Sequence, residues 1–303
     1  MAPLVNRERV LFIGIGNMGW PMAARLHAGG FRLSVNDTTE ERVRAFADQV
    51  GGRCVRNPAD DAGEADVIIT MLPTSRHVAA VMDGLRPSLR AGQIVIEMTS
   101  GVPSITQSIA TNLSQLGVSM VDAPVSGGVP RAVSGDLTIM AGGNSVALDQ
   151  VDSILRAMGS TIHRIGPIGS GQAMKALNNL VSAGGFLIGI EALIIGQKFG
   201  IEASLMTDVL NASTGMNNST QKKFKQFVLS RKFDSGFGLD LMVKDLSIAL
   251  GIARDVDAAS PFASLCRELS AAAAALLGPG QDHTALAKLS ETLSGTELGA
   301  TDR

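Results

Sequence analysis

One lysine and two asparagines stand near the start of a very apolar stretch, GQAMKALNNLVSAGGFLIGIEALIIGQKFG, at residues 171–200. Lys175 and Asn179 are four residues apart, so on a helix they share one face; Asn178 is a weaker candidate for the same face. Apolar surroundings and a neighbouring cation both favour the neutral form of an amine, whose reference pKa is about 10.4. The pattern therefore indicates a lysine that exchanges protons between about pH 7 and 9. The alternative interpretation is a lysine that extends its ammonium into solvent from a helix start.

The apolar stretch is too short for a membrane span. Residues 180–190 carry no charge, but a span needs about 20 predominantly apolar residues. Glu191 and Lys198 follow this run, and Lys175 precedes it. We therefore expect a core helix with no membrane contact, in which Gly185 and Gly189 form a close packing surface.

A glycine-rich loop follows the first apolar run of the chain, residues 9–15, and opens a helix. In the pattern GxGxxG, the first glycine permits a tight turn, the second lets a pyrophosphate approach the backbone, and the third lets helix and strand pack closely. The helix N-terminus offers free N–H groups to the phosphates. The sequence therefore predicts a dinucleotide-binding loop made of Gly14, Ile15, Gly16, Asn17, Met18 and Gly19.

An acidic residue ends the second strand-like run. Asp37 lies 18 residues beyond Gly19, close to the offset of about 20 residues expected for the acid that binds the adenosine ribose. A carboxylate there accepts from the ribose hydroxyls and repels a 2′-phosphate, so the sequence favours NAD over NADP. Arg42 and Arg44 follow shortly afterwards and keep NADP open as the less favoured cofactor.

The order of apolar runs divides the chain into two parts. Strand-like runs at 9–15, 31–37, 65–73, 93–100, 118–124 and 136–142 alternate with helical segments, which is typical of a parallel sheet covered on both faces. Thr74 is the expected cap of the helix at 74–82. After residue 171 only helical patterns follow. We expect a Rossmann-type α/β domain at 1–168 and an all-α domain at 169–303, joined by a long helix at about 170–199.

Composition excludes several classes of protein. The 303 residues include 26 basic and 28 acidic ones, with no basic block that would bind nucleic acid. Cys54 and Cys266 form no motif, and the N-terminal segment shows no targeting signal, so we expect a cytoplasmic protein. No catalytic metal is expected, because the histidines have no ligand spacing: they are His27, His77, His163 and His283.

Four motifs in order resemble those of the β-hydroxyacid dehydrogenases, the family of 3-hydroxyisobutyrate dehydrogenase and tartronate semialdehyde reductase, of 6-phosphogluconate dehydrogenase type. The resemblance covers nearly the whole chain and is much more specific than the glycine loop alone. The motifs are FIGIGNMGWPMA at 12–23, DAPVSGGVPRAVSGDLTIMAGG at 122–143, GQAMKALNN at 171–179 and LMVKDLSIAL at 241–250.

The resemblance implies a role for each matching residue. Lys175 would be the catalytic lysine, and Asn179 would position substrate and lysine. Lys244 would reach the substrate and the nicotinamide, while Asp245 would be structural. Where the family usually has Asp and Ser, this chain has Glu97 and Thr99, neither of which threatens the chemistry. The substrate's carboxylate or hydroxyl would be held by Ser126, Gly127 and Gly128, and the cofactor would be lined by Met71, Leu72, Pro73, Thr99 and Ser100.

The resulting expectation is NAD-dependent oxidation of the hydroxyl of a short, 3-hydroxyisobutyrate-like 3-hydroxy carboxylic acid to the semialdehyde or keto acid, with the lysine as general acid and base. One alternative is an NADPH-dependent reductase of a small semialdehyde of the tartronate, succinic or glyoxylate type, and another is a catalytically silent dinucleotide-binding module. An imine reductase is less favoured, because the chain has both Lys175 and the pair Lys244-Asp245, here called the KD motif. Asn217 and Asn218 favour a polar, hydroxylated acid. The apolar helical faces predict a homodimer or homotetramer.

Overall fold

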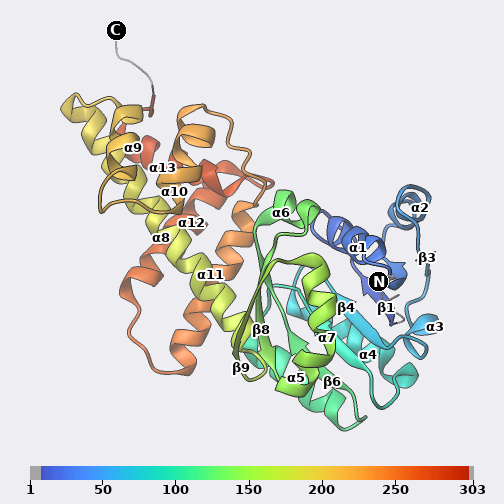
Figure 1. Ribbon diagram of the computed structural model, residues 1–303. Coiled ribbons are helices and arrows are strands. Elements are labelled where there is room, and N and C mark those ends of the chain that lie inside the picture. The colour runs from blue at the N-terminus through green and yellow to red at the C-terminus, as the bar shows by residue number, and fades with distance from the viewer. Residues whose placement is uncertain (1–7, 300–303) are drawn as a thin grey trace. The chain divides into compact units, whose positions relative to one another are not determined.

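The computed structural model describes residues 8–299, which fold into two compact units (Figure 1). Of the described residues, the first unit comprises 8–175 and the second 176–299. The division falls inside the long helix α8, Ser170–Phe199, five residues after the helix begins. The expected boundary at residue 168 stays a prediction, and the ends of both expected domains, residues 1–7 and 300–303, lie outside the described residues.

The first unit is built on a mixed, mainly parallel sheet with the order β3-β2-β1-β4-β5-β6-β8-β7, and β9 pairs with β8. Pairing is parallel from β3 to β6 and antiparallel where β8 meets β6 and β7. The strands are β1 Arg9–Ile13, β2 Arg32–Asn36, β3 Arg53–Cys54, β4 Val67–Thr70, β5 Ile94–Glu97, β6 Ser119–Asp122, β7 Val125–Ser126, β8 Thr138–Gly143 and β9 Thr161–Gly166.

The Rossmann-type fold class is confirmed, and the sheet is parallel over most of its width; the antiparallel pairing of β8 with β6 and β7 was not predicted. Only residues 127–137 separate β7 from β8. A parallel crossover needs a dozen or more residues, so this shorter connection returns the chain antiparallel. The strand β9 was not expected either, because its sequence, TIHRIG, is short and half polar and lacks an alternating pattern.

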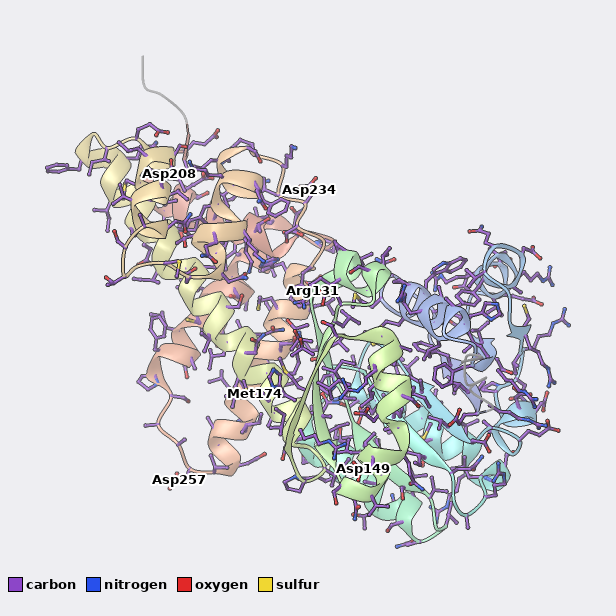
Figure 2. All side chains as sticks on the ribbon, in the orientation of Figure 1. Arg131, Asp149, Met174, Asp208, Asp234 and Asp257 are labelled. Atoms are coloured by element: carbon purple, nitrogen blue, oxygen red, sulfur yellow. The ribbon has the colours of Figure 1, made fainter. Side chains whose placement is uncertain are left out.

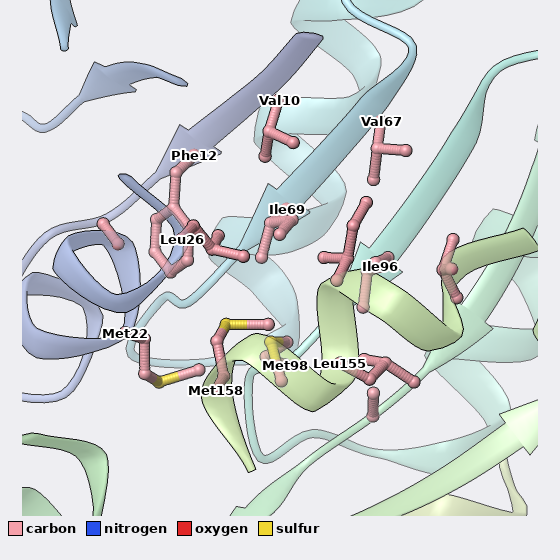
Figure 3. Packing of buried hydrophobic residues seen from close by; sticks show 14 of the residues in the cluster. Val10, Phe12, Met22, Leu26, Val67, Ile69, Ile96, Met98, Leu155 and Met158 are labelled. Atoms are coloured by element: carbon pink, nitrogen blue, oxygen red, sulfur yellow. The ribbon is translucent and has the colours of Figure 1, made fainter. Parts of the chain in front are cut away.

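Two apolar layers cover the sheet. On one face, side chains of β1, β4 and β5 pack against α1 (Gly19–Ala28) and α7 (Ser145–Met158), as Figure 3 shows for Phe12, Met22 and Leu155. On the other face, the alternate strand positions, such as Leu11 and Ile68, pack against α4 (Ser75–Leu85) and α5 (Pro103–Ser114). The remaining helices of this unit are α2 Glu40–Gln49, α3 Ala59–Ala62, η1 Arg86–Ser88 and α6 Gly128–Ser134.

Thr74 occupies the N-cap position of α4, but its side chain makes no capping hydrogen bond. Its hydroxyl instead lies 2.8 Å from Nδ1 of His77. The expectation that the Thr74 side chain caps this helix is therefore wrong, because the nearby imidazole takes the hydroxyl.

The second unit is helical, as expected. Its core gathers around the apolar face of α8, where Phe186, Ile190 and Leu193 contact Phe224 and Leu286 in one buried cluster. The elements after α8 are α9 Ala203–Asn211, α10 Asn218–Lys222, the π-helical η2 Phe224–Leu229, α11 Leu239–Asp255, α12 Pro261–Leu277, η3 His283–Leu286 and α13 Ala287–Ser294.

Of the two glycines expected to form a close packing surface on α8, only Gly189 leaves no room for a Cβ atom, whereas Gly185 makes an ordinary van der Waals contact. A Cβ atom at Gly185 would lie 3.5 Å from the side chain of Asn217, and one at Gly189 would lie 2.5 Å from the Phe224 ring. Within residues 8–299, α8 is the one helix whose length and composition would allow it to cross a membrane; 56% of its most apolar window is buried inside the protein. The expectation that this stretch is too short for a span is therefore wrong, whereas the burial of its most apolar window fits the expected core helix.

Candidate active site

The glycine loop after β1 has the geometry that a bound dinucleotide requires. Gly14 has φ +95°, and a Cβ there would lie 2.3 Å from the carbonyl oxygen of Met71, so only glycine fits. A Cβ at Gly19 would lie 1.9 Å from the carbonyl oxygen of Gly14. At Gly16, by contrast, a Cβ would meet no atom within 4 Å. The backbone at Gly16 is thus open to a ligand, and the loop fits the pyrophosphate of a dinucleotide.

Asp37 follows β2 and lies beside this loop. Its Oδ2 accepts from the backbone N–H of Ile15 at 3.0 Å, which ties the end of β2 to the glycine loop. Its Oδ1 accepts from the Thr39 N–H at 2.9 Å and from the Arg42 guanidinium at 2.9 Å. The Asp37 side chain is only 7% exposed, so its orientation is fixed, whereas Arg42 is 41% exposed.

The loops after β4 and β5 are joined by one hydrogen bond. The backbone N–H of Leu72 donates to the Thr99 hydroxyl at 2.8 Å, and Thr99 is fully buried. Met71 and Leu72 are half-buried, while Pro73 is exposed and Ser100 is half-buried. The structure therefore brings the expected cofactor-lining residues together at the carboxyl ends of neighbouring strands, where ligands of such sheets bind.

The N-terminus of α8 is anchored by a buried carboxylate from β6. Asp122 accepts from the backbone N–H of Gly169 at 2.7 Å and from that of Gln172 at 2.8 Å. The Gln172 amide then donates to the Thr99 carbonyl at 2.7 Å and accepts from the Gly101 N–H at 2.8 Å. These contacts fix the first turn of α8, and Lys175 follows in the second turn. The roles of Asp122 and Gln172 were not predicted from the sequence.

A second buried carboxyl group lies beside the first, since Glu97 of β5 pairs in register with Asp122 of β6. The pKa of Glu97 is raised to about 7, and burial is the main cause. The Asp122 carboxylate also raises this pKa, whereas the hydrogen bond donated by the Thr106 hydroxyl at 2.7 Å lowers it. Burial also raises the pKa of Asp122, although the backbone N–H groups of α8 oppose it.

Ser126, Gly127 and Gly128 form the turn from β7 into α6. Gly127 has φ +135° and Gly128 has φ +66°, and a Cβ at Gly127 would lie 2.8 Å from the side chain of Arg131. Two successive glycines are therefore needed for this turn. Ser126 is half-buried and pairs with Thr138 of β8.

Lys175 and Asn179 lie one turn apart on α8, just after Met174, which Figure 2 labels. Lys175 is half-buried, and Asn179 is 7% exposed. The Asn179 amide nitrogen donates to Oδ2 of Asp245 on α11 at 2.5 Å, while its oxygen accepts from the Asn178 amide at 3.1 Å.

The KD motif supplies the other half of this cluster. Asp245 is 1% exposed, and its Oδ1 lies 3.4 Å from Nζ of Lys244. The Asp245 carboxylate thus contacts both the amide of Asn179 and the ammonium of Lys244. The family resemblance implied a structural role for Asp245. The hydrogen bond from the Asn179 amide shows how the Asp245 carboxylate would act: it orients Asn179.

Among residues 8–299, no group of three or more His, Cys, Asp or Glu side chains is arranged to hold a metal ion. His77 and His163 are exposed, whereas His283 is buried.

Asn217 caps α10: its oxygen accepts from the N–H groups of Ser219 and Thr220.

Comparisons with known proteins agree with this geometry. Residues 9–166 match the model of the NAD-binding domain of 6-phosphogluconate dehydrogenase. Residues 169–290 match the model described as the NAD-binding domain of NADP-dependent 3-hydroxyisobutyrate dehydrogenase. The chain is 31% identical to 2-(hydroxymethyl)glutarate dehydrogenase of Eubacterium barkeri, over 96% of this chain and 97% of that protein.

The chain belongs to the β-hydroxyacid dehydrogenase family. It is accordingly an NAD(P)-dependent oxidoreductase that acts on the CH–OH group of a hydroxy acid.

Two further members of the family are similar to this chain. NAD-dependent L-serine dehydrogenase of Pseudomonas aeruginosa is 34% identical over 86% of this chain and 91% of that protein. The solved structure of Mycobacterium tuberculosis 3-hydroxyisobutyrate dehydrogenase with L-serine matches with a TM-score of 0.86 and 28% identity, covering 95% of this chain and 99% of that one.

Proposed function

We propose that this family member uses NAD⁺ to oxidise the hydroxyl group of a short 3-hydroxy carboxylic acid to the semialdehyde, with Lys175 as the general base. The observation that carries the proposal is the anchoring of α8. Asp122 and Gln172 fix its first turn, and Asp245 fixes Asn179 one turn beyond Lys175. Such anchoring gives the lysine and the amide defined positions on one face of the helix, as catalysis requires.

When bound, the nicotinamide takes up the hydrogen and two electrons that leave the alcohol carbon. The residues that would hold this cofactor are the glycine loop at 14–19, Asp37 at the ribose, and the loops at 71–73 and 99–100. The NAD preference rests on Asp37, whose buried carboxylate would repel a 2′-phosphate.

Lys175 would remove the hydroxyl proton in the forward direction and return it in the reverse direction. Asn179 would hold the substrate oxygen and the amine in line, since its own amide is oriented by Asp245. Ser126, Gly127 and Gly128 would bind the substrate carboxylate through a hydroxyl and backbone N–H groups. Lys244 would add a positive charge to the substrate site.

The three relatives suggest the substrate core. 3-Hydroxyisobutyrate, L-serine and 2-(hydroxymethyl)glutarate all carry a hydroxymethyl group on the carbon that bears a carboxylate, and they differ in the third substituent. We infer that this chain acts on the same hydroxymethyl core.

The alternative is the reverse reaction, in which a small semialdehyde is reduced with NADPH. Arg42 favours it to a degree, because its guanidinium lies 2.9 Å from Asp37 and could turn to a 2′-phosphate. A catalytically silent dinucleotide-binding module has no use for the anchored pair of Lys175 and Asn179.

We also propose a homodimer or homotetramer, because α8 exposes Val181, Ile188, Ile195 and Phe199 at 55–83% of their surface. Size-exclusion chromatography with light scattering tests this; a monomer at micromolar concentration would contradict it.

We also propose a cytoplasmic location, because both cysteines, Cys54 and Cys266, are free thiols.

The test of the proposed function follows NADH at 340 nm. The purified protein is mixed with NAD⁺ and, in turn, 3-hydroxyisobutyrate, L-serine, 2-(hydroxymethyl)glutarate, glycerate, threonate and 4-hydroxybutyrate. We expect turnover of at least one acid with the hydroxymethyl core, and loss of that turnover in Lys175→Met. Binding of NAD⁺ without turnover of any acid or reduction of its semialdehyde would contradict the proposal and favour the silent module.

A further inference from the structure

A lysine outside the family motifs faces α8 in the helical unit. Lys223 lies at the junction of α10 and the π-helical η2, and its Nζ donates to the Ser182 hydroxyl of α8 at 3.1 Å. π-Helical turns occur frequently at functional sites.

Two contacts with α8 hold the segment that carries this lysine, and the one at Gly189 requires a glycine. Gly185 admits the side chain of Asn217, whose amide also donates to the Gly185 carbonyl at 3.4 Å, and Gly189 admits the Phe224 ring. Asn217 caps α10 and thereby fixes the residues that lead to Lys223. The close approach of these segments thus fixes the backbone from which the ammonium reaches α8.

No ion pair joins Lys223 to a carboxylate within the part of the chain that the structure describes. The carboxylate of Asp282 attracts the Lys223 ammonium electrostatically. This carboxylate already accepts several hydrogen bonds: from the Ser235 hydroxyl, the N–H groups of Gly236 and Phe237, and the N–H and hydroxyl of Thr284. Asp234, labelled in Figure 2, precedes Ser235 in this loop. An ammonium in this position is therefore only partly compensated.

The remaining neighbour does not compensate the charge. His283 is 5% exposed and packs against Phe186 and Phe237, and its Nε2 has no hydrogen-bond partner among the described residues. Burial, and after it the Lys223 ammonium, lower the pKa of His283 to about 4 although Asp282 opposes them, so the ring is neutral at pH 7. Burial also lowers the pKa of Lys223 to about 8, although Asp282 opposes this, so the amine is still mostly protonated at pH 7.

Lys223 contacts α8 at Ser182, about one turn beyond Asn179 of the proposed reaction. Ser182 follows Asn179 by three residues, so the two share one face of α8, one turn apart. Three residues of helix rise about 4.5 Å, which is the length of a short substituent on the substrate. A half-buried cation with incomplete compensation, held at this position on α8, is a site for an anion.

We propose that Lys223 binds a second anionic group on the substrate, carried by the substituent that differs among the relatives' substrates. The inference rests on the proposed function and narrows its substrate class. The preferred substrate is a hydroxy acid with two carboxylates: one beside the hydroxymethyl group, and a second a few bonds away that meets the Lys223 ammonium. Lys223 is then the residue that determines specificity.

The test compares 2-(hydroxymethyl)glutarate with 3-hydroxyisobutyrate, which lacks the second carboxylate. For the unaltered protein we expect kcat/KM to favour the dicarboxylate by about 10-fold or more. Lys223→Met should lower kcat/KM for the dicarboxylate by about 10- to 100-fold, mainly through KM, because a charge-assisted hydrogen bond is lost. The same change should alter kcat/KM for 3-hydroxyisobutyrate less than about 3-fold.

Two matched variants complete the comparison. Lys222→Met, at an exposed neighbouring position, should leave both substrates unaffected, and Lys223→Arg should keep the preference for the dicarboxylate. An equal loss for both substrates in Lys223→Met, or a wild-type preference for the monocarboxylate, would overturn the inference.

A binding measurement separates this inference from the proposed function. Calorimetry on the NAD⁺-loaded protein compares glutarate with pentanoate, which has the same chain length and one carboxylate. We expect glutarate to bind about 10-fold more tightly or better, and Lys223→Met to remove that difference. If glutarate binds no more tightly than pentanoate, the inference is overturned, even if the protein oxidises hydroxy acids. If glutarate is preferred but no hydroxy acid is oxidised, the result counts against the proposed function alone.

Discussion

The side-chain amide of Asn179 donates a hydrogen bond of 2.5 Å to the buried carboxylate of Asp245, which joins α8 to α11 within the helical unit. The same carboxylate faces the Lys244 ammonium at 3.4 Å. Since the Asn178 amide donates to the oxygen of Asn179, both ends of the Asn179 amide have defined partners. The orientation of a residue expected to contact substrate is therefore set by residues of the KD motif and by its own neighbour.

Asp245→Ala should lower kcat by about 10- to 100-fold, because it releases the Asn179 amide and leaves it without its acceptor. NAD⁺ affinity should change less than about 2-fold, and Asp245→Asn, which keeps an acceptor oxygen, should recover much of kcat. Steady-state kinetics and NAD⁺ titration measure these quantities, with the exposed Asp240→Ala as the control. Wild-type kcat in Asp245→Ala would show that this carboxylate does not position Asn179.

Asp37 and Arg42 should together determine the choice between the two cofactors. Asp37→Ala removes the carboxylate that repels a 2′-phosphate and releases Arg42, now 2.9 Å away, to bind one. We expect the ratio of kcat/KM for NAD to that for NADP to fall by about 100-fold or more. Combining it with Arg42→Ala should abolish the gain with NADP, and Asp48→Ala, exposed on α2, should leave the ratio unchanged. An unaltered ratio in Asp37→Ala would remove Asp37 from cofactor selection.

Glu97 should make the protein less stable as the pH rises. Burial raises its pKa from 4.5 to about 7, so the folded state holds the proton more tightly than the unfolded chain does. The stabilisation is fully present below about pH 4.5 and is lost as the pH rises through 7, with a total of about 3 kcal/mol at 1.36 kcal/mol per pKa unit. Urea unfolding at pH 5 and pH 8 isolates this contribution as a difference between variants, because His283 and Asp122 also titrate but are present in all of them. The wild type and Glu41→Gln should each lose more stability, or gain less, over this interval than Glu97→Gln does; equal changes in all three would refute the prediction.

The sequence was most informative where local chemistry decides the structure. The glycine loop at 14–19 and the long helix beginning near residue 170 were predictable, because their signals are short motifs and periodic apolar residues. The anchoring of α8 was not predictable, since Asp122 lies 47 and 50 residues from its partners Gly169 and Gln172. No periodic pattern records a pair at that separation.

Residues 213–224 illustrate the same limit. Asn217 was interpreted as a residue favouring a polar substrate, yet its side chain caps α10, and Thr220 three residues later completes the capping box. That spacing was a signal that could have been found. The position of Lys223 depends instead on the contacts of Gly185 and Gly189 with this segment, and only the folded structure shows them.

The central claim is that Lys175 transfers the substrate proton, and its most direct test is the pH–rate profile of Lys175→Met with and without added ethylamine. We predict that NAD⁺ binding stays within about 2-fold, that oxidation of the best hydroxy acid falls by about 10²- to 10⁴-fold, and that ethylamine restores part of the rate as its neutral form accumulates. Lys175→Arg should likewise be slow, with its rate rising at a higher pH than in the wild type. Oxidation by Lys175→Met at the wild-type rate with the wild-type pH profile would contradict the account.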